Sequence, residues 1–64
     1  MMTEREKSEL NSQLNEAVMQ LIQAQKYLNQ RDFIRSGVHL STVQDMLPKV
    51  HLKLFTANRK LHTH

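Results

Sequence analysis

YLNQRDF, residues 27–33, interrupts two regular patterns of apolar residues near the middle of this 64-residue chain. The stretch contains neither glycine nor proline, so its composition does not mark it as a turn. It is either the polar side of one long helix or the corner between two helices. The apolar patterns before and after the stretch distinguish these two possibilities.

The first pattern ends at Leu28. Apolar residues recur there at alternating intervals of four and three, which is the heptad spacing of a helix that packs along one side. The members are Leu10, Leu14, Ala17, Leu21, Ala24 and Leu28. Thr3 is a suitable N-cap, and Glu6, three residues later, completes a capping-box pattern. We therefore expect a first helix over about residues 4–28.

The second pattern begins at Phe33 and alternates between intervals of three and four. Only Ser36 is polar among its members, which are Phe33, Ser36, Leu40, Val43, Leu47, Val50, Leu54, Ala57 and Leu61. The spacing predicts a second helix over about residues 32–60, followed by a frayed tail at 61–64.

Between the two patterns, a continuous helix would place Arg31 and Arg35 in the core, and both are charged. Asn29 can adopt the left-handed conformation that ends a helix. Asp32 is a favourable N-cap for a helix that follows it. We therefore expect YLNQRDF to form the corner of a helical hairpin, with the corner at about residues 29–32.

Pro48 lies inside the second pattern, where a proline removes one backbone hydrogen bond and costs about 3 kcal/mol. The apolar spacing nevertheless continues across it, and Pro48 falls on the side away from the pattern. This favours a helix that continues and is kinked at Pro48. The alternative is a third helix with Pro48 at its first position.

These elements predict an all-α protein, an antiparallel two-helix hairpin in a single domain that covers residues 1–64. A chain of 64 residues without cysteine has little core of its own and no disulfide to stabilise it. We therefore expect a homo-oligomer, a dimer in which two hairpins form a four-helix bundle.

Four apolar residues of the second helix fall outside its heptad pattern. We call them the outer stripe: Ile34, Val38, Leu52 and Phe55. Contiguous exposed apolar residues usually mark an interface. The outer stripe is therefore either the dimer interface or a docking surface for an unidentified partner protein.

The net charge of +3 is unevenly distributed, because the stretch from Lys49 onward has no carboxylate side chain and carries four basic residues: Lys49, Lys53, Arg59 and Lys60. They are possible nucleic-acid contacts. They also suit the end of a helix, where positive charge complements the helix dipole, and they can face the acidic start of the first helix.

No enzymatic motif is present, and we expect no enzyme activity and no cofactor. The candidates for metal binding are the histidines His39, His51, His62 and His64, which lack both cysteine partners and zinc-site spacing, so we expect no metal site. The chain shows no signal peptide and no apolar run long enough to span a membrane, so we expect a cytoplasmic location without membrane contact.

The start of the chain, TEREKSELN, resembles that of the Rop family of plasmid copy-number regulators. Glu6, Lys7, Leu10 and Asn11 match the opening of that family, and Lys26 falls where it has a basic contact residue. The resemblance implies a dimeric helical hairpin that binds paired RNA loops. Asn15 stands where the family has an aromatic residue on its RNA-binding face.

In size and overall character the chain is also similar to the small, cysteine-free helical proteins of the exo–xis region of lambdoid bacteriophages. That resemblance implies a regulator that acts through protein contacts on host processes or on the choice between lysis and lysogeny. We expect such a regulatory adaptor, with a Rop-like nucleic-acid-binding protein as the alternative.

Overall fold

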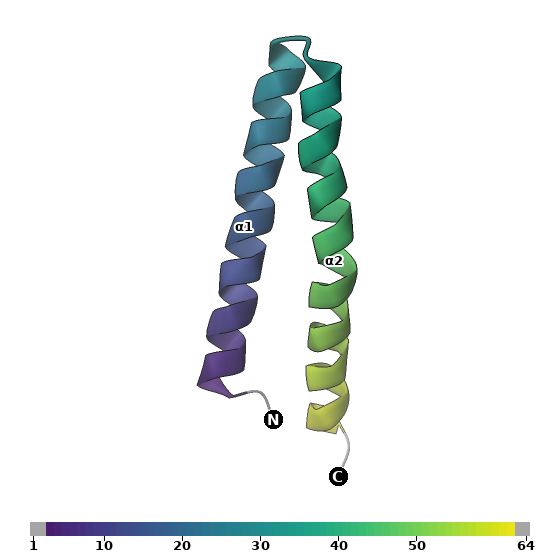
Figure 1. Ribbon diagram of the computed structural model, residues 1–64. Helices are drawn as coiled ribbons and strands as arrows, with labels where there is room; N and C mark the ends of the chain where they lie inside the picture. The colour runs from purple at the N-terminus through teal and green to yellow at the C-terminus, as the bar shows by residue number, and fades with distance from the viewer. Residues whose placement is uncertain (1–2, 63–64) are drawn as a thin grey trace.

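The computed structural model describes residues 3–62, with side chains described as far as Arg59. It contains two helices, α1 (Glu4–Asn29) and α2 (Phe33–His62), and no strand occurs in this part of the chain. The helices lie side by side and run in opposite directions, with the corner at one end and both termini at the other (Figure 1). The prediction of an all-α antiparallel hairpin is confirmed.

The first turn of α1 is capped as the sequence predicts. The hydroxyl oxygen of Thr3 accepts a hydrogen bond from the backbone N–H of Glu6 at 3.1 Å. The same hydroxyl donates to Oε1 of Glu6 at 3.2 Å. The two side chains thus cap the helix together, although the carboxylate of Glu6 binds the Thr3 hydroxyl and not the Thr3 backbone N–H of a full capping box.

The corner is closed by two backbone hydrogen bonds around Arg31. The N–H of Arg31 donates to the carbonyl of Leu28 at 2.9 Å, and the N–H of Asp32 donates to the carbonyl of Tyr27 at 2.8 Å. Arg31 has φ 62°, which is left-handed backbone. This is the Schellman arrangement, which satisfies carbonyl groups that a helix end leaves without partners.

The prediction that Asn29 adopts the left-handed conformation is wrong. Asn29 is the last residue of α1, and Arg31 takes that conformation two positions later. The physical reason is that α1 runs one residue further than expected and that the Schellman arrangement places the left-handed residue after the C-cap, which is Gln30. The left-handed position therefore moves onto a residue type that offers no local side-chain compensation for it.

The first turn of α2 is capped by Asp32, which confirms that prediction. Oδ1 of Asp32 accepts a hydrogen bond from the N–H of Arg35 at 3.1 Å, and its backbone carbonyl accepts from the N–H of Ser36 at 3.1 Å. The backbone N–H of Asp32 also donates the hydrogen bond to Tyr27 that closes the end of α1. One residue therefore completes the end of α1 and begins α2.

The helix α2 passes through Pro48 without a break, so no third helix begins there. The kink at Pro48 stays a prediction. The tail expected to fray from residue 61 is helical through His62. Residues 63 and 64 lie outside the described part of the chain.

The contact between the helices is narrow. Its buried residues are spaced by sevens on each helix: Leu10, Ala17 and Ala24 on α1, and Val43 and Val50 on α2. Ser36 continues the α2 row and donates a hydrogen bond from its hydroxyl to the carbonyl of Ala24 at 2.8 Å. Only one of the two heptad positions of each helix is therefore buried in the hairpin.

Candidate functional site: the exposed apolar surfaces

The other heptad position of each helix is largely exposed and is occupied by leucine, except for Phe33 at the start of α2. We call this surface the leucine face. Its side chains are between 40% and 52% exposed: Leu14, Leu21, Leu28, Leu40, Leu47 and Leu54. The sequence pattern places all of them in the core, and the hairpin alone does not bury them.

The leucines of both helices lie on the same side of the hairpin. Leu28 follows the buried Ala24 by four residues, and Leu40 follows Ser36 by four, which rotates each leucine row by about 40° from the buried row. Because the helices are antiparallel, equal rotations turn both rows toward one face. The hydrogen bond between Ser36 and Ala24 also fixes the position of one helix relative to the other along their axes, so that Leu21 lies at about the height of Leu40.

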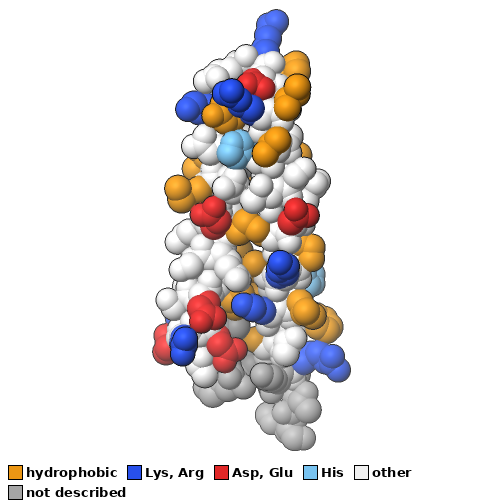
Figure 2. Space-filling view, in the orientation of Figure 1, with side chains coloured by type: hydrophobic (Ala, Val, Ile, Leu, Met, Phe, Trp, Pro, Cys, Tyr) orange, Lys and Arg blue, Asp and Glu red, His pale blue; other side chains and the backbone are white. Residues whose placement is uncertain are grey.

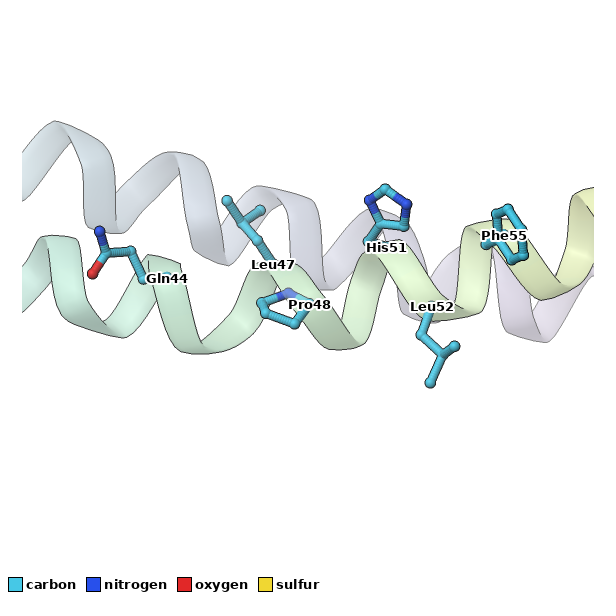
Figure 3. A pocket seen from close by; sticks show the side chains of 6 residues that line it. All are labelled: Gln44, Leu47, Pro48, His51, Leu52 and Phe55. Carbon is cyan, nitrogen blue, oxygen red and sulfur yellow. The ribbon is translucent and has the colours of Figure 1, made fainter.

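An open apolar groove of about 710 Å³ extends this surface around the outside of α2 at Pro48. Its lining residues are Gln44, Leu47, Pro48, His51, Leu52 and Phe55. Figure 3 shows His51 and Leu52 on opposite edges of the helix, with Pro48 between them. The rings of His51 and Phe55 lie 6.5 Å apart at 30°. The groove thus connects Leu47 of the leucine face with Leu52 and Phe55 of the outer stripe.

All four residues of the outer stripe are exposed, at 82% for Ile34, 59% for Val38, 64% for Leu52 and 53% for Phe55. They form two pairs, because fourteen residues separate Val38 from Leu52 and correspond to about 21 Å along the helix. Only the second pair lines the groove. The outer stripe therefore offers two separate apolar patches.

The basic candidates have different neighbours. Lys49 lies beside Asp45 in a shallow pocket, whereas the guanidinium of Arg59 lies 5.9 Å from the centre of the Phe55 ring. Lys53 is exposed, and neither Lys49 nor Lys53 lies within 4.0 Å of a described carboxylate. The side chain of Lys60 lies outside the described residues.

Basic and acidic side chains alternate over the face of the hairpin that Figure 2 shows, while hydrophobic side chains gather along the outer edge of α2. The ion pairs Arg5–Glu9 and Arg35–Asp32 join neighbouring residues in the sequence and not the two helices. The visible face therefore carries mixed charge and no patch of a single sign.

A polar cluster that the sequence did not suggest lies on the side of the hairpin opposite the leucine face. The rings of Tyr27 and His39 stack with centres 5.5 Å apart and planes at 3°. Nδ1 of His39 lies 2.6 Å from Oε1 of Gln20. Lys26 and Arg35 each place their charge 5.7 Å from the Tyr27 ring centre. Tyr27 follows Ala24 by three residues, and His39 follows Ser36 by three. This shared spacing places both rings on the same side of the helix contact, and it is the signal in the sequence that could have revealed the cluster.

Within the described residues, no three histidine or acidic side chains come together as metal ligands, and neither helix has an apolar stretch that could cross a membrane. His39 belongs to the polar cluster and His51 to the groove. The side chain of His62 and all of His64 lie outside the described part.

The comparison with known proteins connects the chain to a bacterial prophage. No protein-family model and no solved structure matches it. A protein of Haemophilus influenzae, described as an uncharacterized protein in the Mu-like prophage FluMu region, is 37% identical over 54 residues. The match covers 84% of this chain and 95% of the relative. The chain belongs to the family of this prophage protein.

A match of 54 residues is longer than either helix, so in this prophage family the similarity extends across the corner and over parts of both helices. The relative supports the predicted association with phages. It comes from a Mu-like prophage, and it gives no support to the resemblance to the lambdoid exo–xis region or to the Rop family.

Proposed function

We propose that this member of the prophage family is a non-enzymatic regulatory adaptor that acts by protein–protein contact in the host cytoplasm, as a homodimer. The observation that carries this proposal is the apolar groove beside Pro48. Leu52 and Phe55 project there at more than half exposure, which is the type of surface that binds another protein.

The shape of the groove suggests how a partner is held. The groove follows α2 from Gln44 to Phe55, over about 16 Å of helix. An amphipathic helix can lay its apolar side into such a groove. We propose a host or phage protein that presents such a helix, and we propose host processes or the choice between lysis and lysogeny as the regulated step.

The test is capture of proteins from a bacterial lysate on the immobilised chain, with and without nuclease treatment. The variant Leu52→Glu/Phe55→Ser removes the groove, while Ile34→Glu/Val38→Glu alters the other pair of the outer stripe and serves as the matched control. We expect the first variant to lose the captured protein and the second to retain it, with both helical by circular dichroism. Equal capture by wild type and by the groove variant contradicts the proposal.

Nuclease treatment separates this proposal from nucleic-acid binding. Capture that disappears with nuclease favours the alternative in which Lys49, Lys53, Arg59 and Lys60 contact phosphates. The affinity for RNA or DNA would then fall by about 0.7–0.9 log units per log unit of salt for each phosphate neutralised. The absence of RNA or DNA binding at low salt excludes that alternative.

A further inference from the structure

We infer that the leucine face is covered by the leucine face of a second copy of this chain, so that four helices share one core. This inference rests on the homodimer of the proposed function and assigns its interface. It differs from the sequence-based alternative in which the outer stripe forms the dimer interface.

The hairpin exposes more surface than a compact monomer of the same mass. The hairpin exposes 5457 Å², whereas a compact monomer of 7.5 kDa exposes about 4,250 Å². The excess is about 1,200 Å² per chain, or about 2,400 Å² for two chains. A standard stable interface buries about 1,600 Å² in total and obligate dimers bury about 2,000 Å² or more. One interface with a second copy therefore accounts for the excess.

The leucine face is complementary to itself. Leu21 lies level with Leu40, and by the same interval of seven Leu14 lies level with Leu47. Beyond these two leucine layers, Leu28 lies level with Phe33 and Leu54 with Lys7. A twofold arrangement that aligns one central leucine layer therefore aligns the other, as a symmetric dimer requires. The six leucines carry no charge, and Lys7, which continues the α1 row at the open end of the hairpin, is exposed, so the centre of the pairing surface is free of charge.

The other surfaces fit a second copy less well. A dimer through the outer stripe would have to cover Asp45, which lies between its two apolar pairs. A dimer through the polar cluster would bury Lys26 and Arg35 beside the Tyr27 ring. Removing such charges from water carries a large penalty. The leucine face is the surface where pairing avoids that penalty.

Sedimentation equilibrium and thermal unfolding over a range of protein concentrations test whether wild type is a dimer. We expect a dimer at micromolar concentration and a melting temperature that rises with concentration, because association stabilises the folded chain by mass action. A wild-type protein that is monomeric at about 100 times these concentrations, with a constant melting temperature, overturns the inference.

Single cysteines locate the interface without removing apolar contacts, and the chain has no cysteine of its own. We expect Leu21→Cys and Leu40→Cys in the dimer to react with a thiol-alkylating reagent at least about tenfold more slowly than Ile34→Cys, because buried thiols react through opened states. Equal rates in a dimeric protein place the interface elsewhere and overturn the inference.

The experiments separate this inference from the adaptor proposal. We expect Leu52→Glu/Phe55→Ser to remain dimeric while it loses the captured partner. A monomeric wild type that still captures its partner through the groove would overturn the dimer in both proposals and leave the adaptor role. A dimer with slowly alkylated leucine positions and no groove-dependent capture would leave the dimer and overturn the adaptor.

Discussion

The hydroxyl of Ser36 donates a hydrogen bond of 2.8 Å to the backbone carbonyl of Ala24, and this bond joins the two helices near the corner. Ser36 stands in a row of otherwise apolar residues and is partly buried. Its hydroxyl therefore has a partner where an unpaired polar group would be costly.

Removal of this bond should lower stability. We expect Ser36→Ala to lose about 1 kcal/mol from the hydrogen bond and to regain up to about 0.5 kcal/mol from the better helix propensity of alanine. Ser41→Ala, at an exposed position of the same helix, should show only the stabilisation that comes from the better helix propensity of alanine. Urea unfolding of both variants measures the difference, and equal effects would show that the bond contributes nothing.

The left-handed Arg31 gives a second prediction. Glycine adopts φ 62° without a steric penalty, so Arg31→Gly should raise the free energy of unfolding by about 0.5–1 kcal/mol. Asn29→Gly, at the last helical residue, should lower it by about 0.3 kcal/mol, because glycine has a somewhat lower helix propensity than asparagine. Chemical denaturation measures both free energies of unfolding. If Asn29→Gly is the stabilised variant and Arg31→Gly the destabilised one, the left-handed residue is Asn29.

Gly37 gives a third prediction, because an added Cβ atom at this position meets no other atom within 4 Å. Gly37→Ala should therefore stabilise α2 by about 0.5–1 kcal/mol through a lower entropy of the unfolded chain. Thermal and urea unfolding measure the change. A loss of stability would show that a second chain packs closely against Gly37.

The polar cluster gives a fourth prediction. His39→Ala removes both the stacking on Tyr27 and the contact with Gln20, and it should cost about 1–2 kcal/mol. His51→Ala changes an exposed histidine whose ring lies 6.5 Å from that of Phe55 and has no contact like the one with Gln20, so it should cost less. Equal losses for the two variants, measured by urea unfolding, would contradict a stabilising role for the cluster.

The features that the sequence predicted well are those that depend on local rules. The breakdown of the apolar spacing at Arg31 located the corner, and the side chains of Thr3 and Asp32 cap the helices as their types suggest. Helix continuity through Pro48 also followed from the unbroken spacing. Each of these features is decided within a few neighbouring residues.

The features that the sequence missed depend on the relation between the helices. The spacing assigns Ala24 and Leu28 to the same core, but a hairpin of two helices can cover only one of the two rows. Likewise, Tyr27 and His39 are twelve residues apart and meet only because the corner aligns them. The groove at Pro48 needs the three-dimensional surface, since its residues belong to four different rows of α2.

The corner has one further consequence, which concerns insertions. Asp32 closes the end of α1 and caps α2, so no spare residue exists between the two helices. One added residue in the corner would break either the backbone bonds that close α1 or the Asp32 cap of α2, and it would disturb the alignment of Leu40 with Leu21. Members of the prophage family should therefore keep the length of this corner constant even where its residues differ.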